Sequence, residues 1–296
     1  MSIKYVVIVF MAIGMSGAGP DPAHEKSVQE YRTKMEATLK SDAGWLTVAG
    51  LHWLKPGETS FGSDPKSGFV LPSGKAAAKG GVFKFDGKKV VLKVEPAAKI
   101  LVNGKAFTEG ALIDDGAEKT PDLVTTGDLS MIVIERGGKF GIRLRDKSSK
   151  YRKEFTHRSW YPVKADYNVK GKFLPYAVAK KLRVPTVIEG VIEEHESPGE
   201  IEFQLAGATH RAQVLKAGEG QLWLIFRDRS SGKATYPAGR FLYGDLAKDG
   251  TVSFDFNKAY NPPCAYTPFA TCPLPPRQNS LKVAVEAGEL TYHLEP

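Results

Sequence analysis

The sequence lacks the short motifs that mark several common enzyme classes. Neither a Gly-x-x-x-x-Gly-Lys-Ser/Thr nor a Gly-x-Gly-x-x-Gly stretch is present, so no motif predicts a nucleotide cofactor. The absence of a Gly-x-Ser-x-Gly elbow argues against an α/β-hydrolase. The six histidines show neither His-x-His nor His-Glu-x-x-His spacing. We therefore expect no cofactor and no metal site, and the sequence leaves open whether the protein is an enzyme.

Long apolar runs are equally scarce. The clearest one follows Lys4, spans residues 5–15 and ends in the small residues 16–19. It is too short to span a bilayer and is typical of a secretory signal peptide, with a buried N-terminal strand as the alternative. We expect residues 1–19 to be removed and the mature protein to be periplasmic or extracellular. No later segment is apolar enough to span a membrane, so a membrane-spanning protein is not expected.

Charge is plentiful but not concentrated. Lysine and arginine exceed aspartate and glutamate by 41 to 33, a formal net charge of +8, and the basic residues are scattered. Nucleic-acid binders usually gather charge on one stripe together with stacking aromatics. This distribution is typical of a solvated basic surface, and we expect no nucleic-acid partner. The oligomeric state is left open.

The first structural element after the leader should be a helix over residues 24–44. Ser27 and Glu30 have the spacing of a capping box. Val28, Tyr31 and Met35 then recur at helical spacing, as does Leu39. An amphipathic helix of this kind should place its apolar stripe on the body of the protein.

Residues 45–150 change to short β-type runs separated by turns. Asp86-Gly87, Asn103-Gly104 and the Gly-Gly pair at 137–138 each lie between such runs. Regular alternation of strands and turns predicts a β-sandwich. The charged stretch 147–154 is the expected domain boundary.

Residues 151–296 should form a second β-rich domain. The pattern predicts a short helix over 174–183 and seven or eight strands that include 187–194, 201–205, 210–215, 222–227, 241–243, 252–256 and 281–285. A closed barrel or curled sheet would remove the exposed edges of so many strands. The fold class is therefore all-β: a sandwich, then a barrel-like domain, with one short N-terminal amphipathic helix.

The segment 255–276 is the most distinctive part of the chain. It contains both cysteines and six prolines, together with several aromatic residues. Proline fixes φ and removes a hydrogen-bond donor, so this segment can be neither a helix interior nor a central strand. A rigid, polar and aromatic loop is a favourable place for a binding or catalytic site.

This loop also carries a family resemblance. The stretch DFNKAYNPPCAYTPFATCPLPP, followed by VAVEAGE at 283–289, resembles the signature of a prokaryotic family catalogued as domain of unknown function 1684. The blocks WLTVAGLHWLKPGETSFGSD at 45–64 and YPAGRFLY at 236–243 are similar to its other recurring blocks. The resemblance implies a fold and a site at the loop, and it brings no activity with it.

The sandwich half also resembles a forkhead-associated (FHA) domain. The stretch 61–63 matches a Gly-Arg turn, 102–105 an Asn-Gly turn and 123–128 a late Gly-Asp turn. Ser63 stands where that resemblance would place the phosphate-binding arginine, and no Ser-x-x-His partner follows. The resemblance therefore implies the fold and does not imply phosphopeptide binding.

Cys264 and Cys272 enclose seven residues. In an exported protein an even cysteine count favours a disulfide. Free structural cysteines and a catalytic thiol are the alternatives, and the thiol would need a cationic partner.

The candidate ligand-binding residues are Asp255, Asn257, Tyr260, Asn261 and Arg240. Asp255 and Asn257 would share one face if the strand 252–256 continued. They could instead tie down the proline-rich loop. Arg240 could hold an anion in bidentate fashion, or pair with Asp255 or Glu286 as a buried bridge.

These observations favour an exported protein that binds a small polar or anionic molecule in the C-terminal β-domain. One alternative is a hydrolase with Asp255 as the general base and catalytic candidate. Another is a structural or interaction module of the cell envelope.

Overall fold

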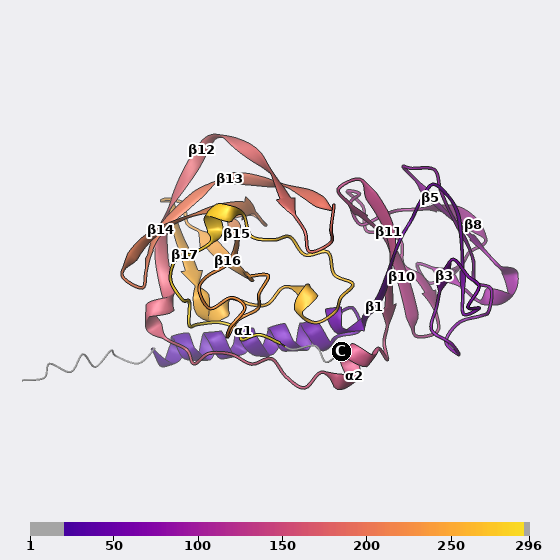
Figure 1. The fold of residues 1–296 in the computed structure, drawn as a ribbon, viewed down its shortest axis with the longest axis horizontal. Helices are drawn as coiled ribbons and strands as arrows, with labels where there is room; N and C mark the ends of the chain where they lie inside the picture. Colours follow the sequence, from indigo (N-terminus) through magenta and orange to yellow (C-terminus); the bar gives the residue numbers. More distant parts are fainter. Residues whose placement is uncertain (1–20, 293–296) are drawn as a thin grey trace, which may run out of the picture.

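A computed structural model describes residues 21–292. Two β-rich halves lie side by side, with the N-terminal sandwich on the right and the C-terminal barrel on the left (Figure 1). A single long helix runs beneath the barrel toward the sandwich. The expected signal peptide, residues 1–19, lies outside the described residues. Within residues 21–292 no helix has the length and apolar character to cross a membrane.

The helix α1 spans Pro22–Lys40 and begins earlier than the sequence pattern predicts. Its N-cap is Asp21, whose side chain accepts a hydrogen bond from the Ala23 amide (3.3 Å), and Pro22 occupies the first turn. Proline suits that position because its missing N–H would have no helical partner there. The expected capping box at Ser27 is wrong, because Ser27 lies inside the helix.

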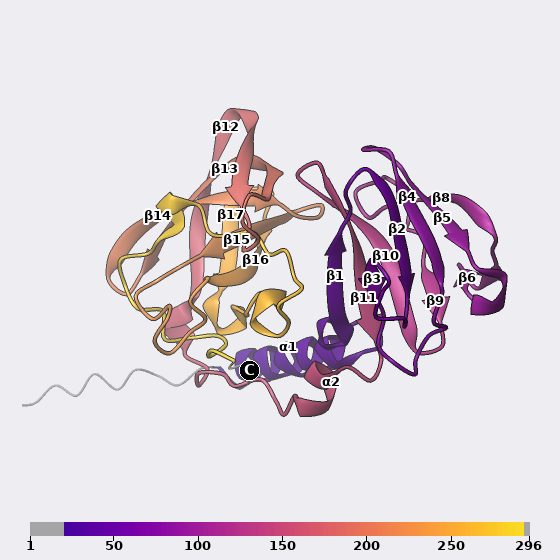
Figure 2. The same cartoon turned by 45° about the vertical axis from the view of Figure 1, so that its right-hand side comes forward.

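The N-terminal half is a sandwich of two sheets that face each other, as Figure 2 shows. One sheet has the order β1-β11-β10-β9-β6-β7 and the other β3-β2-β4-β5-β8. The strands are β1 (Val48–Trp53), β2 (Gly57–Gly62), β3 (Phe69–Val70), β4 (Gly81–Phe85), β5 (Val90–Val94), β6 (Leu101–Val102), β7 (Lys105–Ala106), β8 (Glu109–Leu112), β9 (Val124–Thr126), β10 (Leu129–Arg136) and β11 (Lys139–Asp146). The three turns expected from the glycine-containing pairs are confirmed.

Alternating side chains build the sandwich core. In β4 and β10 the buried residues recur at every second position, as one-sided strands require, and they include Phe83, Phe85, Met131 and Val133. A 3₁₀ turn at Trp45–Thr47 joins α1 to β1, and the short helix α2 (Lys150–Glu154) lies at the expected boundary.

The C-terminal half is a closed barrel, as expected, but it has six strands rather than seven or eight. They are β12 (Asn168–Pro185), β13 (Ile192–Leu205), β14 (Ala208–Lys216), β15 (Gln221–Phe226), β16 (Arg240–Leu246) and β17 (Thr251–Asp255). Pairing of Asn168 with Asp255 begins the β12–β17 contact that closes the sheet. Closure removes the exposed edges of the sheet.

Three expected elements of this half are wrong. The predicted strand at 187–194 is mainly the turn between β12 and β13, because β12 ends at Pro185 and β13 begins at Ile192. The predicted helix at 174–183 is part of β12, because this stretch pairs with β13 on both sides of an irregularity between Pro175 and Lys180. Tertiary pairing has overridden local helical preference here. The predicted strand at 281–285 is not a strand. It contributes Leu281 and Val285 to the barrel core as an irregular chain.

The barrel lumen is filled by apolar side chains. Ile201, Leu224, Phe226 and Phe254 are among the inward residues, and each is nearly or completely buried. Barrels of few strands leave space only for such packing. The lumen is therefore a core, and a ligand site has to be sought on the outside of the barrel.

The sandwich offers a prediction on acid stability. The Asp146 side chain is 6% exposed, with Lys75 Nζ 2.5 Å from its Oδ2 and the Ser148 amide donating to its Oδ1 (2.9 Å). Burial opposes ionisation, but these partners outweigh it and lower the pKa of Asp146. The ionised carboxylate thus stabilises the fold above the unfolded pKa of about 3.9, and this stabilisation is lost as pH falls through the lower, folded-state pKa.

Asp146→Asn should therefore reduce stability at neutral pH, and the difference from wild type should shrink below about pH 4. Urea-unfolding midpoints at pH 7 and pH 3 measure this. Asp128→Asn, an exposed change in the same half, is the control and should have little effect at either pH. An equal loss for Asp146→Asn at both pH values would contradict the assignment.

Candidate functional site

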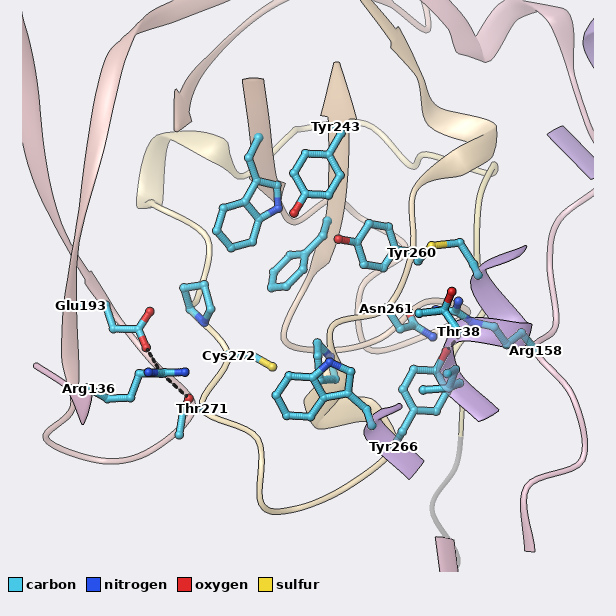
Figure 3. A pocket seen from close by; sticks show the side chains of 17 residues that line it. Thr38, Arg136, Arg158, Glu193, Tyr243, Tyr260, Asn261, Tyr266, Thr271 and Cys272 are labelled. Atoms are coloured by element: carbon cyan, nitrogen blue, oxygen red, sulfur yellow. Dashed lines mark hydrogen bonds and ion pairs between the residues drawn. The ribbon is translucent and has the colours of Figure 1, made fainter. Parts of the chain in front are cut away.

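The candidate site is a cavity of about 400 Å³ where the barrel wall, α1 and the proline-rich loop meet (Figure 3). Strands β15 and β16 supply the barrel side, and the segment 260–273 supplies most of the opposite wall. The Arg136–Glu193 pair lies at one side, where a sandwich hairpin approaches the start of β13, and Arg158 lies at the other. The cavity thus draws on both halves and on the helix.

Aromatic rings form the barrel side of the cavity. Leu222 and Leu224 point into the lumen, so Trp223 between them points outward, and Phe241 and Tyr243 do the same on β16. The Trp223 and Tyr243 rings stack with centroids 6.1 Å apart, and Tyr243 and Tyr260 stack at 6.3 Å. Tyr243 is 44% exposed. It therefore stands at the mouth of the cavity.

A buried ion pair closes the opposite side. Arg158 donates to both oxygens of Glu289, at 3.0 Å from Nε and 2.9 Å from Nη2, and to the Tyr266 hydroxyl (3.0 Å). Glu289 also accepts from the Tyr266 hydroxyl and from the Asn261 amide (2.8 Å). Burial opposes the charge of Arg158, but the Glu289 carboxylate outweighs it and raises the pKa of Arg158. Burial raises the pKa of the Glu289 carboxyl, and Arg158 with the Tyr266 hydroxyl acts against this shift. The bidentate contact between Arg158 and Glu289 is the geometry of a buried ion pair.

Glu289 is placed by a tight backbone turn. Gly288 has φ +80°, and a Cβ there would lie 2.6 Å from the Ala259 carbonyl oxygen. Only glycine tolerates this combination of left-handed backbone and close approach. The turn lets the Glu289 amide donate to Ala259 (2.8 Å) while its side chain points at Arg158.

Arg136, the other arginine that lines the cavity, is also paired with carboxylates. Its guanidinium makes two bonds of 2.7 Å to the two oxygens of Asp115 and an ion pair of 3.2 Å with Glu193. It also donates to the Thr271 hydroxyl (3.2 Å), which ties the sandwich hairpin to the proline-rich loop. The charged groups that line the cavity are thus balanced by carboxylates.

Two buried polar atoms of the lining residues have no partner. Trp223 Nε1 and Asn261 Oδ1 are each inaccessible to solvent and make no hydrogen bond among residues 21–292. The rest of the Asn261 side chain is fixed, because its Nδ2 donates to the Leu290 carbonyl (2.7 Å). Buried polar groups in folded proteins are nearly always hydrogen-bonded. One donor and one acceptor are thus left over beside the same cavity.

The structure places two of the five ligand-binding residues expected from the sequence on the cavity and the other three elsewhere. Tyr260 and Asn261 line the cavity. Burial, followed by the neighbouring Tyr243, raises the pKa of the Tyr260 phenol. It therefore remains a neutral hydroxyl at physiological pH.

Asp255, Asn257 and Arg240 do not line the cavity. The strand ends at Asp255, and Phe256–Lys258 form a 3₁₀ turn. Asp255 caps this turn by accepting from the Asn257 amide (3.1 Å), and it faces His24 Nε2 at 2.9 Å. Asn257 pairs with the Lys164 backbone through both its Oδ1 (3.0 Å) and its Nδ2 (2.9 Å). Together they tie α1 and the segment before β12 to the barrel.

Arg240, the first residue of β16, belongs to a buried ion pair. It is completely buried and pairs with Asp228 at 2.9 Å, rather than with Asp255 or Glu286. It also donates to the carbonyl oxygens of Val285 (3.0 Å) and Ala287. This pair fastens the C-terminal segment against the barrel core.

The two cysteines lie side by side as free thiols. The Cys264 amide donates to Cys272 Sγ at 3.2 Å, and Cys272 lines the cavity. Burial raises the pKa of the Cys272 thiol, whereas the hydrogen bond with Cys272 lowers the pKa of Cys264. Within residues 21–292 no cluster of histidine, cysteine and acidic side chains is suited to hold a metal ion.

Several residues that line the cavity, Arg158 among them, were not among the candidate site residues identified from the sequence. Arg158 and Glu289 lie 131 positions apart, and nothing local announces their pairing. Trp223 did have a signal, because a large aromatic residue on the outward face of an alternating strand indicates that this face is covered.

Comparison with known proteins confirms the family resemblance for the C-terminal half. Residues 153–290, which include the barrel and the proline-rich loop, match the family model described as "Protein of unknown function (DUF1684)". No curated protein matches the chain. A solution structure of an uncharacterized protein of Haloarcula marismortui is 28% identical, with a TM-score of 0.40, over 47% of this chain and 79% of that one.

The FHA resemblance is confirmed as a distant structural match over about a third of the chain. One match is an FHA domain from a study of phosphothreonine-dependent interactions, at 18% identity and TM-score 0.23, covering 32% of this chain and 92% of that one. Another is the FhaA FHA domain complexed with the intracellular domain of Rv3910, also at 18% identity and TM-score 0.23, covering 32% and 97%.

The geometry around Asp255 predicts a loss of stability on mutation. Asp255→Asn replaces the charged acceptor of His24 and Asn257, which should destabilise the protein by about 1–3 kcal/mol. Chemical denaturation measures the difference. Asp245→Asn, an exposed change on β16, is the control and should be nearly neutral. An Asp255→Asn protein as stable as wild type would show that this tie is unimportant.

Proposed function

We propose that the protein binds a small, flat, neutral molecule in the cavity between Trp223 and Asn261. The observation that carries this proposal is the pair of unpartnered polar atoms, the Trp223 N–H donor and the Asn261 Oδ1 acceptor, on one aromatic-lined cavity. A cavity of about 400 Å³ lies within the range of small-molecule sites, which are mainly apolar with a few polar groups that fix orientation. Because both atoms are covered in this structure, a ligand with one acceptor and one donor would satisfy them if the neighbouring side chains shift as it binds.

The pairing of charges supports a neutral ligand. Arg158 is held by Glu289, and Arg136 by Asp115 and Glu193. An added anion would have to compete with a carboxylate already in place, and separating such a buried pair is costly. The stacked rings of Trp223, Tyr243 and Tyr260 favour a planar body instead.

Hydrolysis with Asp255 as the base is supported less well. Asp255 accepts hydrogen bonds from His24 and Asn257 and lies outside the cavity. A base should lie within hydrogen-bond reach of the proton that it removes from a bound substrate. The arrangement around Asp255 favours a structural role, and binding without chemistry is the simpler proposal.

Two probes of similar size test the proposal. Naphthalene has only a flat apolar body, whereas 2-quinolone adds a carbonyl acceptor and an N–H donor. Wild-type protein should bind 2-quinolone more tightly than naphthalene. Trp223→Phe keeps an aromatic ring and removes the donor, so it should weaken 2-quinolone binding by about two- to tenfold, the worth of one hydrogen bond, with little effect on naphthalene. Isothermal titration calorimetry measures both.

Trp53→Phe is the matched control, because it makes the same change outside the cavity and should leave both affinities unchanged. Equal loss of 2-quinolone binding in both variants would contradict the site. Absence of binding by either probe to folded wild-type protein would contradict the proposed ligand class and favour an interaction module of the cell envelope.

We also propose that the protein is exported and that Cys264 and Cys272 are joined after export. The apolar leader at residues 5–15 and the contact of the Cys264 amide with Cys272 Sγ (3.2 Å) support this. Protein from the native host should begin near residue 19 and should contain no alkylatable thiol before reduction. N-terminal sequencing and intact mass after alkylation, with and without reductant, test both points. An intact Met1 would rule out the leader, and two free thiols in freshly purified protein would rule out the bridge.

A further inference from the structure

A second cavity, which shares Arg158 with the proposed aromatic site but is otherwise lined by different residues, lies on the other flank of α1. It has a volume of about 520 Å³ and runs between the helix and the segment that precedes β12. Its polar lining includes Gln29, Arg32, Glu36, Lys40 and Arg158. Trp160 supplies an aromatic wall.

Arg32 is the unusual member of this lining. It belongs to the buried stripe of the helix and is only 7% exposed. Its guanidinium lies over the Trp160 ring, 4.8 Å from the centroid, and Arg158 lies over the same ring at 5.4 Å. Two guanidinium groups therefore share one indole, which concentrates positive charge at the wall of the cavity.

The hydrogen bonds of Arg32 are incomplete. Nη2 donates to the Asn257 carbonyl oxygen (3.1 Å), whereas the buried Nε has no partner among residues 21–292. A guanidinium carries five N–H donors, so much of its capacity is unused. A buried charge is normally both paired and hydrogen-bonded.

The carboxylates around Arg32 are already occupied. No ion pair within 4.0 Å joins Arg32 to an acidic residue in the described part of the chain. Asp255 and Glu289 act on it from a distance, but they pair with His24 and Arg158 respectively. Glu36, on the same cavity, accepts from the Arg158 amide (3.1 Å). The positive charge of Arg32 is therefore not matched by a contacting anion of this chain.

We propose that this cavity binds the carboxylate group of a small organic anion, held by Arg32 beside Trp160. A planar carboxylate matches the fork of guanidinium donors. The site should prefer a single negative charge, because one unpaired arginine faces it and Glu36 stands at its wall. Among the other basic residues of the lining, Lys40 is exposed and pairs with Glu36, and Arg158 pairs with Glu289. A doubly charged phosphate would therefore meet the Glu36 carboxylate without a second unpaired buried cation.

Acetate is the simplest probe, and the indole N–H signal of Trp160 in a ¹H–¹⁵N spectrum is the local readout. The chain has four tryptophans, so Trp160→Phe assigns the signal. Titration with sodium acetate at constant ionic strength, with chloride as the balancing anion, should give a saturable shift of this signal in wild-type protein. Inorganic phosphate should give a smaller one.

Arg32→Met keeps the length and packing of the side chain and removes the charge. It should weaken acetate binding by about tenfold to a hundredfold, as expected for loss of a charge-assisted contact. Lys34→Met removes the same charge from an exposed position on the same helix and should leave acetate binding unchanged. Arg32→Lys keeps the charge but loses the fork and should bind with intermediate affinity.

A thermal melt of each variant shows whether it is folded, so that a loss of acetate binding can be distinguished from a loss of structure. Arg32→Met loses the hydrogen bond to the Asn257 carbonyl oxygen and the contact with Trp160, but it also removes a buried charge that no anion contacts. These effects oppose each other, so a folded Arg32→Met protein is expected. The proposal would be overturned by acetate titrations that coincide in wild type and Arg32→Met, or by a stronger response to phosphate than to acetate. Because Trp223 does not line this cavity, the result is separate from that of the 2-quinolone test.

Discussion

The buried carboxylate of Glu289 holds together the parts of the molecule from which the site is built. It receives Arg158 from the segment before β12, and Asn261 and Tyr266 from the proline-rich loop. Its own position depends on the C-terminal segment that closes the barrel. A buried ion pair of this kind is weak evidence for stability, but removal of either partner leaves an uncompensated charge. The positions of the loop, the C-terminal segment and Arg158 therefore depend on one another through this carboxylate.

The barrel acts as a support rather than a container. Its lumen is filled with leucine, isoleucine, valine and phenylalanine, and the pair of Arg240 with Asp228 fastens the C-terminal segment against this core. The outward-facing residues of β15 and β16 are not part of this core, and they line the cavity on the outside of the barrel. Rigid strands hold side chains more precisely than loops do, which suits the aromatic wall of a binding site.

Local features of the fold were predictable from sequence, and features that depend on distant partners were not. Turns at Asp86-Gly87 and Asn103-Gly104 follow from the residues themselves, because few others adopt the backbone angles that they need. The predicted helix at 174–183 was wrong because the strand formed by this stretch is defined by pairing with β13. Of the site residues expected from the sequence, Tyr260 and Asn261 of the proline-rich loop line the cavity, whereas Asp255, Asn257 and Arg240 do not. Pairings such as that of Arg158 with Glu289 have no local signature, so this side of the cavity could not be predicted from the sequence.

Helix α1 is synthesised before the other described elements, but its partners in the barrel domain lie near the end of the chain. Its contacts through His24 and Arg32 join residues 231 and 225 positions apart in the chain. Contacts of such sequence separation close large loops and form slowly compared with local hairpins. Since the helix is a wall of both cavities, neither exists until the C-terminal half has been synthesised and folded. A chain truncated before the C-terminal half would thus lack both cavities, so the proposed binding could begin only after the whole chain had been synthesised and folded.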